Sequence, residues 1–519
     1  MSEGEKMSAA QICISIVIVA YLGFVIVTGI MIGRKSKKTA EGFYLGGRSM
    51  GPIVTAMSAE ASDMSSWLLM GLPGLAYLSG LANASWTAIG LALGTYLNFL
   101  LVAKRLRRYS MQLDAITVPS FISKRYKEKH PIIMCISSLI ILIFFVPYVA
   151  SGLAAIGKLF NSLFGWNYML MVVVGAIVII SYTSVGGFGA VATMDLIQSI
   201  IMTVALIVIT CFGINQAGGM NAVIDNAKAL PGYLSLVSEY HADTGTGSSM
   251  SVISILSMIA WGLGYFGMPH ILVRFMAIRK ESELKLSRRI ASIWVVISMA
   301  VAVFIGIIGY SISKAGRIDM LTTPAASETI IVQIARLLSD HGIFPAIIAG
   351  LILAGILAAT MSTADSQLLA ASSAFSENLL QDVFKIKLKP KQTMLIARLT
   401  VIAIAVLSVF IASDPESSVF AIVSFAWAGF GATFGPAILF ALFWKRSNRY
   451  GIFAGLLTGG IMVFVWKFLI RPLGGFWGIY ELLPAFLCAC IAVIVVSLLT
   501  KAPEKEIIDE FNEYSKRSK

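Results

Sequence analysis

Residues 59–66 read AEASDMSS and residues 261–269 read WGLGYFGMP, and each stretch lies inside an apolar run long enough to cross a bilayer. Serine and aspartate compete with the helix by hydrogen-bonding to nearby backbone, and Pro52 and Pro73 bracket the first run. The second stretch has three glycines and one proline within nine residues, which a continuous helix tolerates poorly. Both stretches therefore predict broken membrane helices.

Broken helices at membrane depth indicate a binding site. Unwound backbone survives there only where it lines a cavity or is buried in protein. Paired interruptions in matching positions of two halves point to the site of a transporter. Here each interrupted run opens a unit of five helices, so the sequence predicts two repeats, at 50–214 and 249–444. The alternative is a pair of kinked structural helices that pack through small residues.

The composition excludes a soluble multidomain enzyme. The 519 residues are 57% hydrophobic and 13% charged, with a mean hydropathy of +0.84, whereas soluble chains are about 25% charged. We therefore expect an all-α polytopic membrane protein, a single domain over residues 1–519. Apolar runs predict thirteen spans, at 9–33, 50–75, 78–103, 131–161, 167–186, 191–214, 249–275, 287–313, 342–373, 394–412, 417–444, 450–470 and 476–499.

The net charge of +13 is an orientation signal. Of the 40 Lys and Arg residues, 32 fall in segments that are cytoplasmic if the N-terminus is outside, and Arg274 is one of them. The positive-inside rule then places the N-terminus outside and the C-terminus inside, as an odd number of spans requires. This distribution argues against a nucleic-acid surface. Residues 500–519 form a short, charged cytoplasmic tail that we expect to be mobile.

Polar residues inside the spans are few, and each is a candidate for the functional site. Asp63 lies within the first interruption and is the strongest candidate. Glu60 lies one helical turn earlier, either as a second charge at the site or facing a water-filled vestibule. Asp195 begins the sixth span, where the helix dipole by itself would favour an acid.

The ninth span has a face of small and hydroxyl residues, because Ala359, Ser362, Thr363 and Ser366 follow helical spacing. Hydroxyls and carbonyls with few full charges suit a weakly held hard monovalent cation such as Na⁺. Ca²⁺ or Mg²⁺ would need more carboxylates. Packing between helices through Ser and Thr is the alternative. Together with the broken second span, this face predicts a metal site for sodium only.

The motifs resemble those of a known transporter family. Residues 62–74, SDMSSWLLMGLPG, resemble the second helix of bacterial sodium/proline symporters, and residues 261–271 resemble their broken seventh helix. GGRS at 46–49 and WAGFG at 427–431 also match. YTSVGGF at 182–188 resembles the signature of the wider sodium:solute symporter family. The resemblance runs from about residue 10 to about residue 502.

The resemblance implies the inverted-repeat fold of the leucine-transporter type, with thirteen helices and alternating access. The first helix, at 9–33, precedes the repeats, and helices 12–13, at 450–499, follow them. One Na⁺ is then expected between the broken second span and the ninth span, and Asp63 matches an aspartate important for sodium coupling. The implied sodium ligands are the carbonyls or hydroxyls of Ala61, Met64, Ala359, Ser362 and Thr363.

The implied substrate residues suit proline. Aromatic walls bury its apolar ring, the N-terminus of a half-helix binds its carboxylate, and unwound carbonyls accept from its ammonium. These residues are Ser65, Tyr148, Trp261, Tyr265 and Pro269.

Two features complicate the resemblance. Proline symporters commonly have glycine at the positions of Glu60 and Ser66, and glutamine at the position of Met268. Some relatives also have a second Na⁺ site, so coupling to two sodium ions is a further hypothesis. The residues that resemble this second site are Asp195, Ser362, Asp365 and Ser366.

The sequence thus predicts sodium-coupled secondary active symport of L-proline across a bacterial cell membrane. The alternative within the family is Na⁺ symport of another small carboxylate-bearing solute, either another amino acid or a sugar acid. A membrane sensor would carry a signalling domain, and a channel would need a continuous polar pore. We expect no enzymatic activity, no organic cofactor and no obligate protein partner, and we expect the partners to be the substrate and the lipid bilayer, with no nucleic acid.

Overall fold

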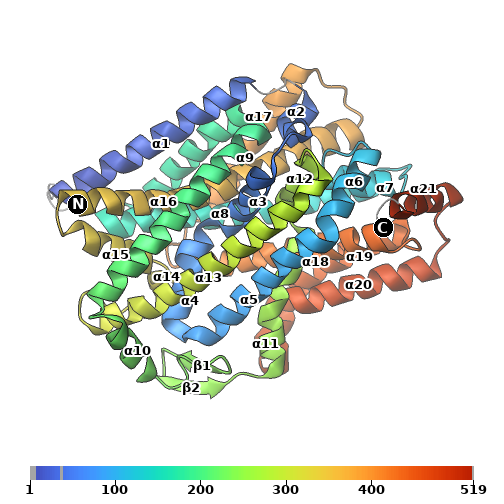
Figure 1. Ribbon diagram of the computed structural model, residues 1–519. Coiled ribbons are helices and arrows are strands. Elements are labelled where there is room, and N and C mark those ends of the chain that lie inside the picture. The colour runs from blue at the N-terminus through green and yellow to red at the C-terminus, as the bar shows by residue number, and fades with distance from the viewer. Residues whose placement is uncertain (1–6, 36–38, 517–519) are drawn as a thin grey trace.

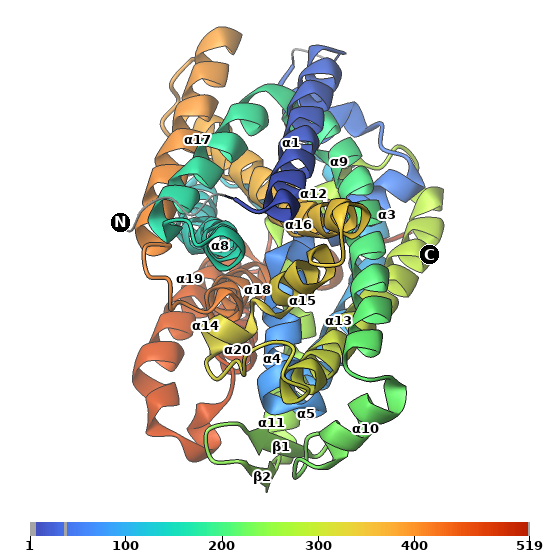
Figure 2. The same ribbon diagram turned by 90° about the vertical axis from the view of Figure 1, so that its left-hand side faces the viewer.

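The computed structural model describes residues 7–35 and 39–516, and most of them are helical (Figures 1 and 2). Elements labelled η are short 3₁₀ or π segments. The first part of the chain forms α1 (Ala9–Lys35), α2 (Ala40–Leu45), η1 (Gly46–Arg48), α3 (Pro52–Ser66), η2 (Trp67–Gly71), α4 (Leu72–Ser79), α5 (Leu81–Leu97), η3 (Asn98–Ala103), α6 (Lys104–Gln112), α7 (Val118–Arg125), α8 (Ile132–Phe164) and α9 (Tyr168–Gln216).

The middle and last parts of the chain continue in the same way. The middle forms α10 (Met220–Lys228), β1 (Ser238–His241), β2 (Thr246–Ser249), α11 (Val252–Ile259), η4 (Ala260–Gly267), α12 (Pro269–Ala277), η5 (Glu281–Glu283), α13 (Leu284–Lys314), α14 (Pro324–Ser327), α15 (Ile330–Ser339) and α16 (Ile343–Ser373). The last part forms η6 (Ala374–Val383), α17 (Pro390–Ile411), α18 (Val419–Phe443), α19 (Arg449–Val465), η7 (Trp466–Ile470), η8 (Arg471–Leu473), η9 (Gly475–Gly478), α20 (Leu482–Leu499) and α21 (Lys505–Lys516).

The protein is a multi-pass membrane protein. Among the described residues, ten helices are long and apolar enough to cross a bilayer, and α11–η4 with α12 forms an eleventh span bent by 50°. The two other predicted spans miss this criterion. The span at 50–75 is interrupted, and the span at 167–186 contains a shorter apolar helix, Tyr168–Ser181. The number thirteen therefore stays a prediction.

Helix α9 explains why the predicted span at 167–186 misses the criterion. Its 49 residues would measure about 74 Å as one straight helix at 1.5 Å per residue, which is more than twice the thickness of a bilayer core. Gly187 divides it, because its φ of 64° is non-helical and favours glycine. This glycine belongs to the motif at 182–188, in which the side chains of residues 182 and 184–186 lie outside the described part.

Segments predicted on the two sides of the membrane lie at opposite ends of the bundle. Figure 1 shows α10, the hairpin of β1 and β2, and α15 at one end, and α2, α6, α7 and α21 at the other. In the hairpin, β1 pairs antiparallel with β2, with Ser238 opposite Ser249. Successive loops of a multi-pass protein lie on alternate sides of the membrane, and the predicted outside and cytoplasmic segments are grouped in that way.

The two predicted interruptions are confirmed. Helix α3 is broken at Ser65, whose φ of 34° and ψ of −168° are not helical. The second interruption is a 3₁₀ segment, η4, followed by an extended Met268 with ψ of 107°. Pro269 then starts α12, at a position where its missing N–H costs nothing.

Glycines let α5 approach the unwound η4 closely. Gly90 and Gly94 are four residues apart and both face Gly262. A Cβ at Gly94 would lie 2.4 Å from the carbonyl oxygen of Gly262, and a Cβ at Gly262 would lie 2.2 Å from that of Gly90. Small residues at this spacing are the usual means of close helix contact in membranes.

The C-terminal tail is more ordered than predicted. Residues Lys505–Lys516 form α21, an amphipathic helix whose Tyr514 is buried and stacks on Tyr109 of α6 at 4.4 Å between ring centroids. Hydrogen bonds and ion pairs with two glutamates of this segment, Glu506 and Glu510, raise the pKa of Lys127. The predicted mobile tail is therefore a docked helix, because its apolar residues recur with helical spacing.

We expect Gly94→Ala to destabilise the protein by about 1–3 kcal/mol, because the added methyl group overpacks a backbone contact. The measurement is the apparent Tm of detergent-purified protein. Gly29→Ala in α1 is the matched control, since a Cβ there meets nothing within 4 Å, and its Tm should stay at the wild-type value. Equal Tm values for both variants would contradict the close contact between α5 and η4.

Candidate functional site

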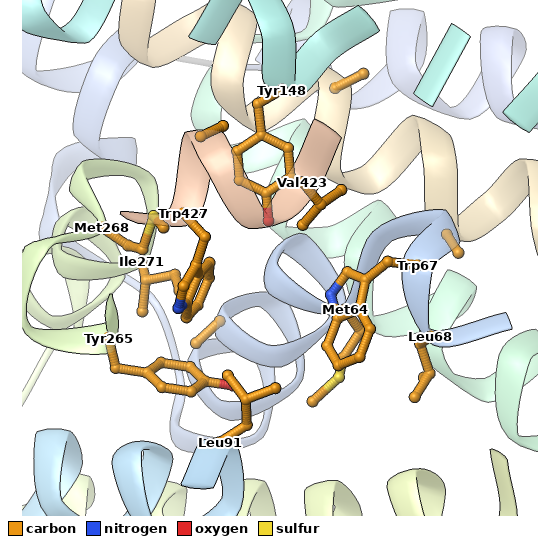
Figure 3. Close-up of a cluster of buried hydrophobic side chains, with 14 of the residues drawn as sticks. Met64, Trp67, Leu68, Leu91, Tyr148, Tyr265, Met268, Ile271, Val423 and Trp427 are labelled. Atoms are coloured by element: carbon orange, nitrogen blue, oxygen red, sulfur yellow. The ribbon is translucent and has the colours of Figure 1, made fainter. Parts of the chain in front are cut away.

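The two broken helices meet α8, α16 and α18 in the interior of the bundle. Figure 3 shows Tyr148, Tyr265 and Trp427, from three different elements, in one buried cluster with Met64 and Trp67. All five side chains are at most 2% exposed. The site is therefore closed to both sides in this structure.

The predicted sodium ligands of α3 and α16 lie together. The hydroxyl of Ser362 donates to the carbonyl of Ala61 at 2.8 Å, and Thr363 Oγ1 lies 3.4 Å from the same oxygen. Ser362 Oγ is also 3.0 Å from the carbonyl oxygen of Ala359. The carbonyl of Met64 accepts from the backbone N–H of Trp67, just past the break. Hydroxyl and carbonyl oxygens in this arrangement can offer lone pairs to a hard cation.

Asp63 joins the two broken helices. Its Oδ2 accepts a short hydrogen bond from the hydroxyl of Tyr265 in η4. Its carbonyl accepts from Trp67 Nε1 at 3.3 Å and from the hydroxyl of Tyr148 at 3.4 Å. Among the described residues, Oδ1 has no partner although Asp63 is fully buried. A buried carboxylate with an open oxygen is a suitable partner for a cation.

The predicted substrate residues fall into two groups, Ser65 and Tyr148 from α3 and α8, and Trp261, Tyr265 and Pro269 from η4 and α12. Ser65 and Tyr148 line a narrow gap beside Thr363 that is too small to hold a water molecule. Trp261 stacks on Tyr480 at 4.9 Å between centroids. Tyr265 reaches Asp63 as described above, and Pro269 begins α12.

Gln367 is a buried polar residue that the sequence reasoning did not single out. It lines the same narrow gap as Ser65 and Tyr148, it is fully buried, and both its Oε1 and its Nε2 are without partners in the part of the chain that the structure describes. The signal was available, because Gln367 follows Thr363 by four residues and so extends the hydroxyl face of α16.

The three departures from the proline-symporter pattern lie in different surroundings. Glu60 is buried against α5, where Thr95 Oγ1 lies 3.4 Å from its Oε2. The hydroxyl of Ser66 is buried without a partner among the described residues. Met268 is fully buried between the two halves of the bent span.

The residues predicted for a second sodium site surround a cation of the chain itself. Asp195 Oδ2 lies 3.1 Å from Nη2 of Arg274, and the same nitrogen donates to the hydroxyl of Ser366. Asp365 Oδ1 lies 3.3 Å from that hydroxyl. Ser362 instead lies within hydrogen-bond distance of the carbonyls of Ala61 and Ala359, in the first predicted sodium site. Arg274 was expected among the cytoplasmic cations, but it is 1% exposed inside the bundle.

A second buried ion pair lies near α18. Lys158 of α8 lies 2.7 Å from Glu328 Oε2, and both side chains are buried. Glu328 also accepts the backbone N–H groups of Val419 and Phe420 at 3.0 Å, in the first turn of α18. The carboxylate thus satisfies free N–H groups and the positive end of the helix dipole. No sequence signal links Lys158 to Glu328, which lies 170 residues later.

Comparisons with known proteins agree with this geometry. Residues 43–459 match the model of the sodium:solute symporter family. The osmoregulated proline transporter OpuE of Bacillus subtilis (strain 168) is 40% identical over 495 residues, which cover 95% of this chain and 96% of that protein. The sodium/proline symporter of Haemophilus influenzae is 41% identical over 481 residues, covering 92% and 93%.

Solved structures share the fold at low identity. A Na⁺-coupled sialic acid symporter in its substrate-bound outward-open state matches with a TM-score of 0.75 and 18% identity, over 95% of this chain and 99% of that chain. A nucleobase-cation-symport-1 family transporter in a closed conformation matches with a TM-score of 0.51 and 14% identity, over 91% and 97%. The fold is therefore the leucine-transporter type, with its two inverted repeats.

We expect Ser65→Ala to lower stability by about 1 kcal/mol, because Ser65 Oγ accepts from the backbone N–H of Trp67 at 3.2 Å across the break. Ser66→Ala is the matched control, since that buried hydroxyl has no partner among the described residues, and it should be neutral or stabilising. The measurement is the apparent Tm in detergent. A larger loss in Ser66→Ala than in Ser65→Ala would contradict this account of the break.

Proposed function

Because the chain belongs to the sodium:solute symporter family, we propose that it carries L-proline into the cell by sodium-coupled symport with alternating access. It is a transporter and not an enzyme. The observation that supports this function best is the cluster of hydroxyls and carbonyls between the first broken helix and α16, next to the buried Asp63, whose Oδ1 has no partner among the described residues. The relatives named as proline transporters match nearly the whole chain.

Na⁺ binds between α3 and α16 in this proposal. Its ligands are the carbonyls of Ala61, Met64 and Ala359 and the hydroxyls of Ser362 and Thr363. Ser362 lies within hydrogen-bond distance of the carbonyls of Ala61 and Ala359, and Thr363 of that of Ala61, which supports four of the five ligands. Met64 is placed with them by the family resemblance. To hold the ion, the hydroxyls of Ser362 and Thr363 would turn their hydrogens away from the carbonyl of Ala61 and offer lone pairs. No organic cofactor takes part.

Asp63 couples the ion to the substrate. It supplies a negative charge one residue from Met64, and its carboxylate holds the hydroxyl of Tyr265 in the opposite broken helix. Na⁺ held nearby would balance the charge of this carboxylate, while the hydrogen bond from Tyr265 keeps the two broken helices together. The inward movement of one Na⁺ gains about 2.3 kcal/mol per 100 mV of membrane potential.

The substrate site lies between the first broken helix, α8 and the second broken helix. Tyr148, Trp261 and Tyr265 supply aromatic walls for the ring of proline. Ser65 offers a hydroxyl, and Pro269 begins α12, where the positive end of the helix dipole favours a carboxylate. The second candidate is another small carboxylate-bearing solute, which the departures at Glu60, Ser66 and Met268 keep open.

The protein lies in the bacterial cell membrane with its N-terminus outside and its C-terminus in the cytoplasm. The distribution of Lys and Arg supports this orientation. It places α21 on the cytoplasmic side and the hairpin outside.

The first test is uptake of labelled L-proline into proteoliposomes. We expect accumulation under an inward Na⁺ gradient and none under an equal K⁺ gradient, because Na⁺ is the proposed coupling ion. Excess unlabelled L-proline should abolish the signal. Equal uptake in both gradients would refute sodium coupling, and Na⁺-driven uptake of a different amino acid or sugar acid without uptake of proline would select the second candidate.

The second test removes single sodium ligands. We expect Ser362→Ala to raise the Na⁺ concentration for half-maximal uptake by about tenfold, equal to ~1.4 kcal/mol. Ser372→Ala is the matched control, because its hydroxyl bonds within its own helix to the carbonyl of Leu369, and it should keep the wild-type value. An unchanged Na⁺ requirement in Ser362→Ala would remove this residue from the ion site. Asp63→Cys should raise the requirement more than Ser362→Ala, since it removes a full charge.

A further inference from the structure

A groove runs between α5 and α13, which lie side by side in the bundle (Figures 1 and 2). Its volume is about 630 Å³, a size typical of sites for small ligands. Its walls are mostly apolar side chains of the two helices, among them Leu93 and Val296, which are 50% and 55% exposed. Exposed apolar surface at membrane depth contacts lipid. The groove is therefore open to an acyl chain of the bilayer.

The groove face of α13 changes from charged to apolar along the helix. Lys285 and Arg288 lie seven and four residues before Ser292, so the three share one face, which continues through Val296 and Val303. From Ser292 to Val303 this face rises about 17 Å, close to one leaflet of a hydrocarbon core about 30 Å thick. A phospholipid has the same order of groups, with a charged headgroup, polar ester groups and then acyl chains.

Arg288 lies at the charged end of the groove. Its guanidinium carbon is 5.1 Å from the ring centroid of Tyr96, which lines the groove from α5. Tyrosine is enriched in membrane proteins at the level of the headgroups. The Nε of Arg288 and the hydroxyl of Ser292 are both buried and have no hydrogen-bond partner among the described residues. This end of the groove therefore lacks acceptors, and phosphate has several acceptor oxygens that arginine binds well.

The acids nearest in sequence do not neutralise these cations. Glu281 pairs with Arg108 at 2.7 Å, and Glu283 pairs with Arg279 at 2.8 Å. The positive end of the helix dipole disfavours cations in the first turns of α13. The positive-inside rule accounts for cations at this end of the span, but it does not require them on the groove face. An excess of positive charge here favours an anionic headgroup over a zwitterionic one.

We propose that this groove binds one phospholipid with an anionic headgroup, such as phosphatidylglycerol. One acyl chain lies between α5 and α13, and the phosphate lies against Arg288 and Ser292. In the proposed orientation the lipid belongs to the cytoplasmic leaflet. It contacts α5, whose Gly90 and Gly94 face the unwound η4, so its binding stabilises the bundle next to the second break. This inference does not depend on which solute the protein carries.

The test measures the apparent Tm of delipidated protein in neutral detergent, with added phosphatidylglycerol or phosphatidylcholine of the same acyl chains. We expect phosphatidylglycerol to raise the Tm of the wild type by about 3 °C, and phosphatidylcholine by less than about 1 °C. Arg288→Gln should lose this difference. Arg449→Gln is the matched control and should keep it, because Arg449 also lies over a tyrosine ring, that of Tyr450 at 4.8 Å, but does not line the groove.

A second variant tests the groove without changing its charge. Ala300 lines the groove and is exposed, so Ala300→Phe fills the groove from the lipid side and should also lose the effect of phosphatidylglycerol. Glycerol 3-phosphate carries the phosphate without acyl chains and should leave the Tm of the wild type unchanged.

Three results would overturn the lipid site. They are an equal effect of the two lipids on the wild type, an undiminished effect of phosphatidylglycerol on Arg288→Gln or Ala300→Phe, and a rise in Tm with glycerol 3-phosphate alone. If Arg288→Gln does not fold, native mass spectrometry of the wild type decides, since preferential retention of phosphatidylglycerol supports the site and equal retention of both lipids overturns it. None of these measurements involves transport, so sodium symport stands or falls separately.

Discussion

Backbone groups released by the two interruptions must find partners inside the bundle, because lipid offers none. The carbonyl of Ala61 faces hydroxyls of α16, and that of Asp63 faces the hydroxyl of Tyr148. In the second interruption, Trp427 donates to the carbonyl of Trp261 at 2.8 Å, and Asn98 donates to that of Tyr265 at 2.9 Å. This requirement fixes which helices surround the breaks, and so it also fixes the site.

The remaining polar groups of the interior follow a similar rule for charge. The described ion pairs of the core join residues from different helices, Lys158 with Glu328 and Arg274 with Asp195. Asp63 differs, because it has a hydroxyl partner and one open oxygen but no cation among the described ion pairs. Glu60 is also buried and outside the described ion pairs, but it lies against α5. Asp63, one residue from Met64 and two from Ala61, is therefore the carboxylate suited to an ion that comes and goes.

Much of the site was predictable from local sequence. The breaks follow from Ser, Asp, Gly and Pro in apolar runs, and the hydroxyl face of α16 follows from helical spacing. Helical spacing also indicated Gln367, four residues after Thr363, and the apolar face of α21. No local pattern identified the partner of Asp195. Arg274 is 79 residues away along the chain, and its position after an apolar run led us to expect it in the cytoplasm.

The sequence by itself determined the membrane class, the two interruptions and the chemistry of the oxygen ligands, because these depend on hydropathy, backbone preference and spacing within one helix. Only the tertiary structure decided which charges neutralise each other, how α5 reaches η4, and that Arg274 stands between Asp195 and Ser366. Such contacts join segments far apart in the chain, and their energies depend on distance and burial that no local pattern encodes.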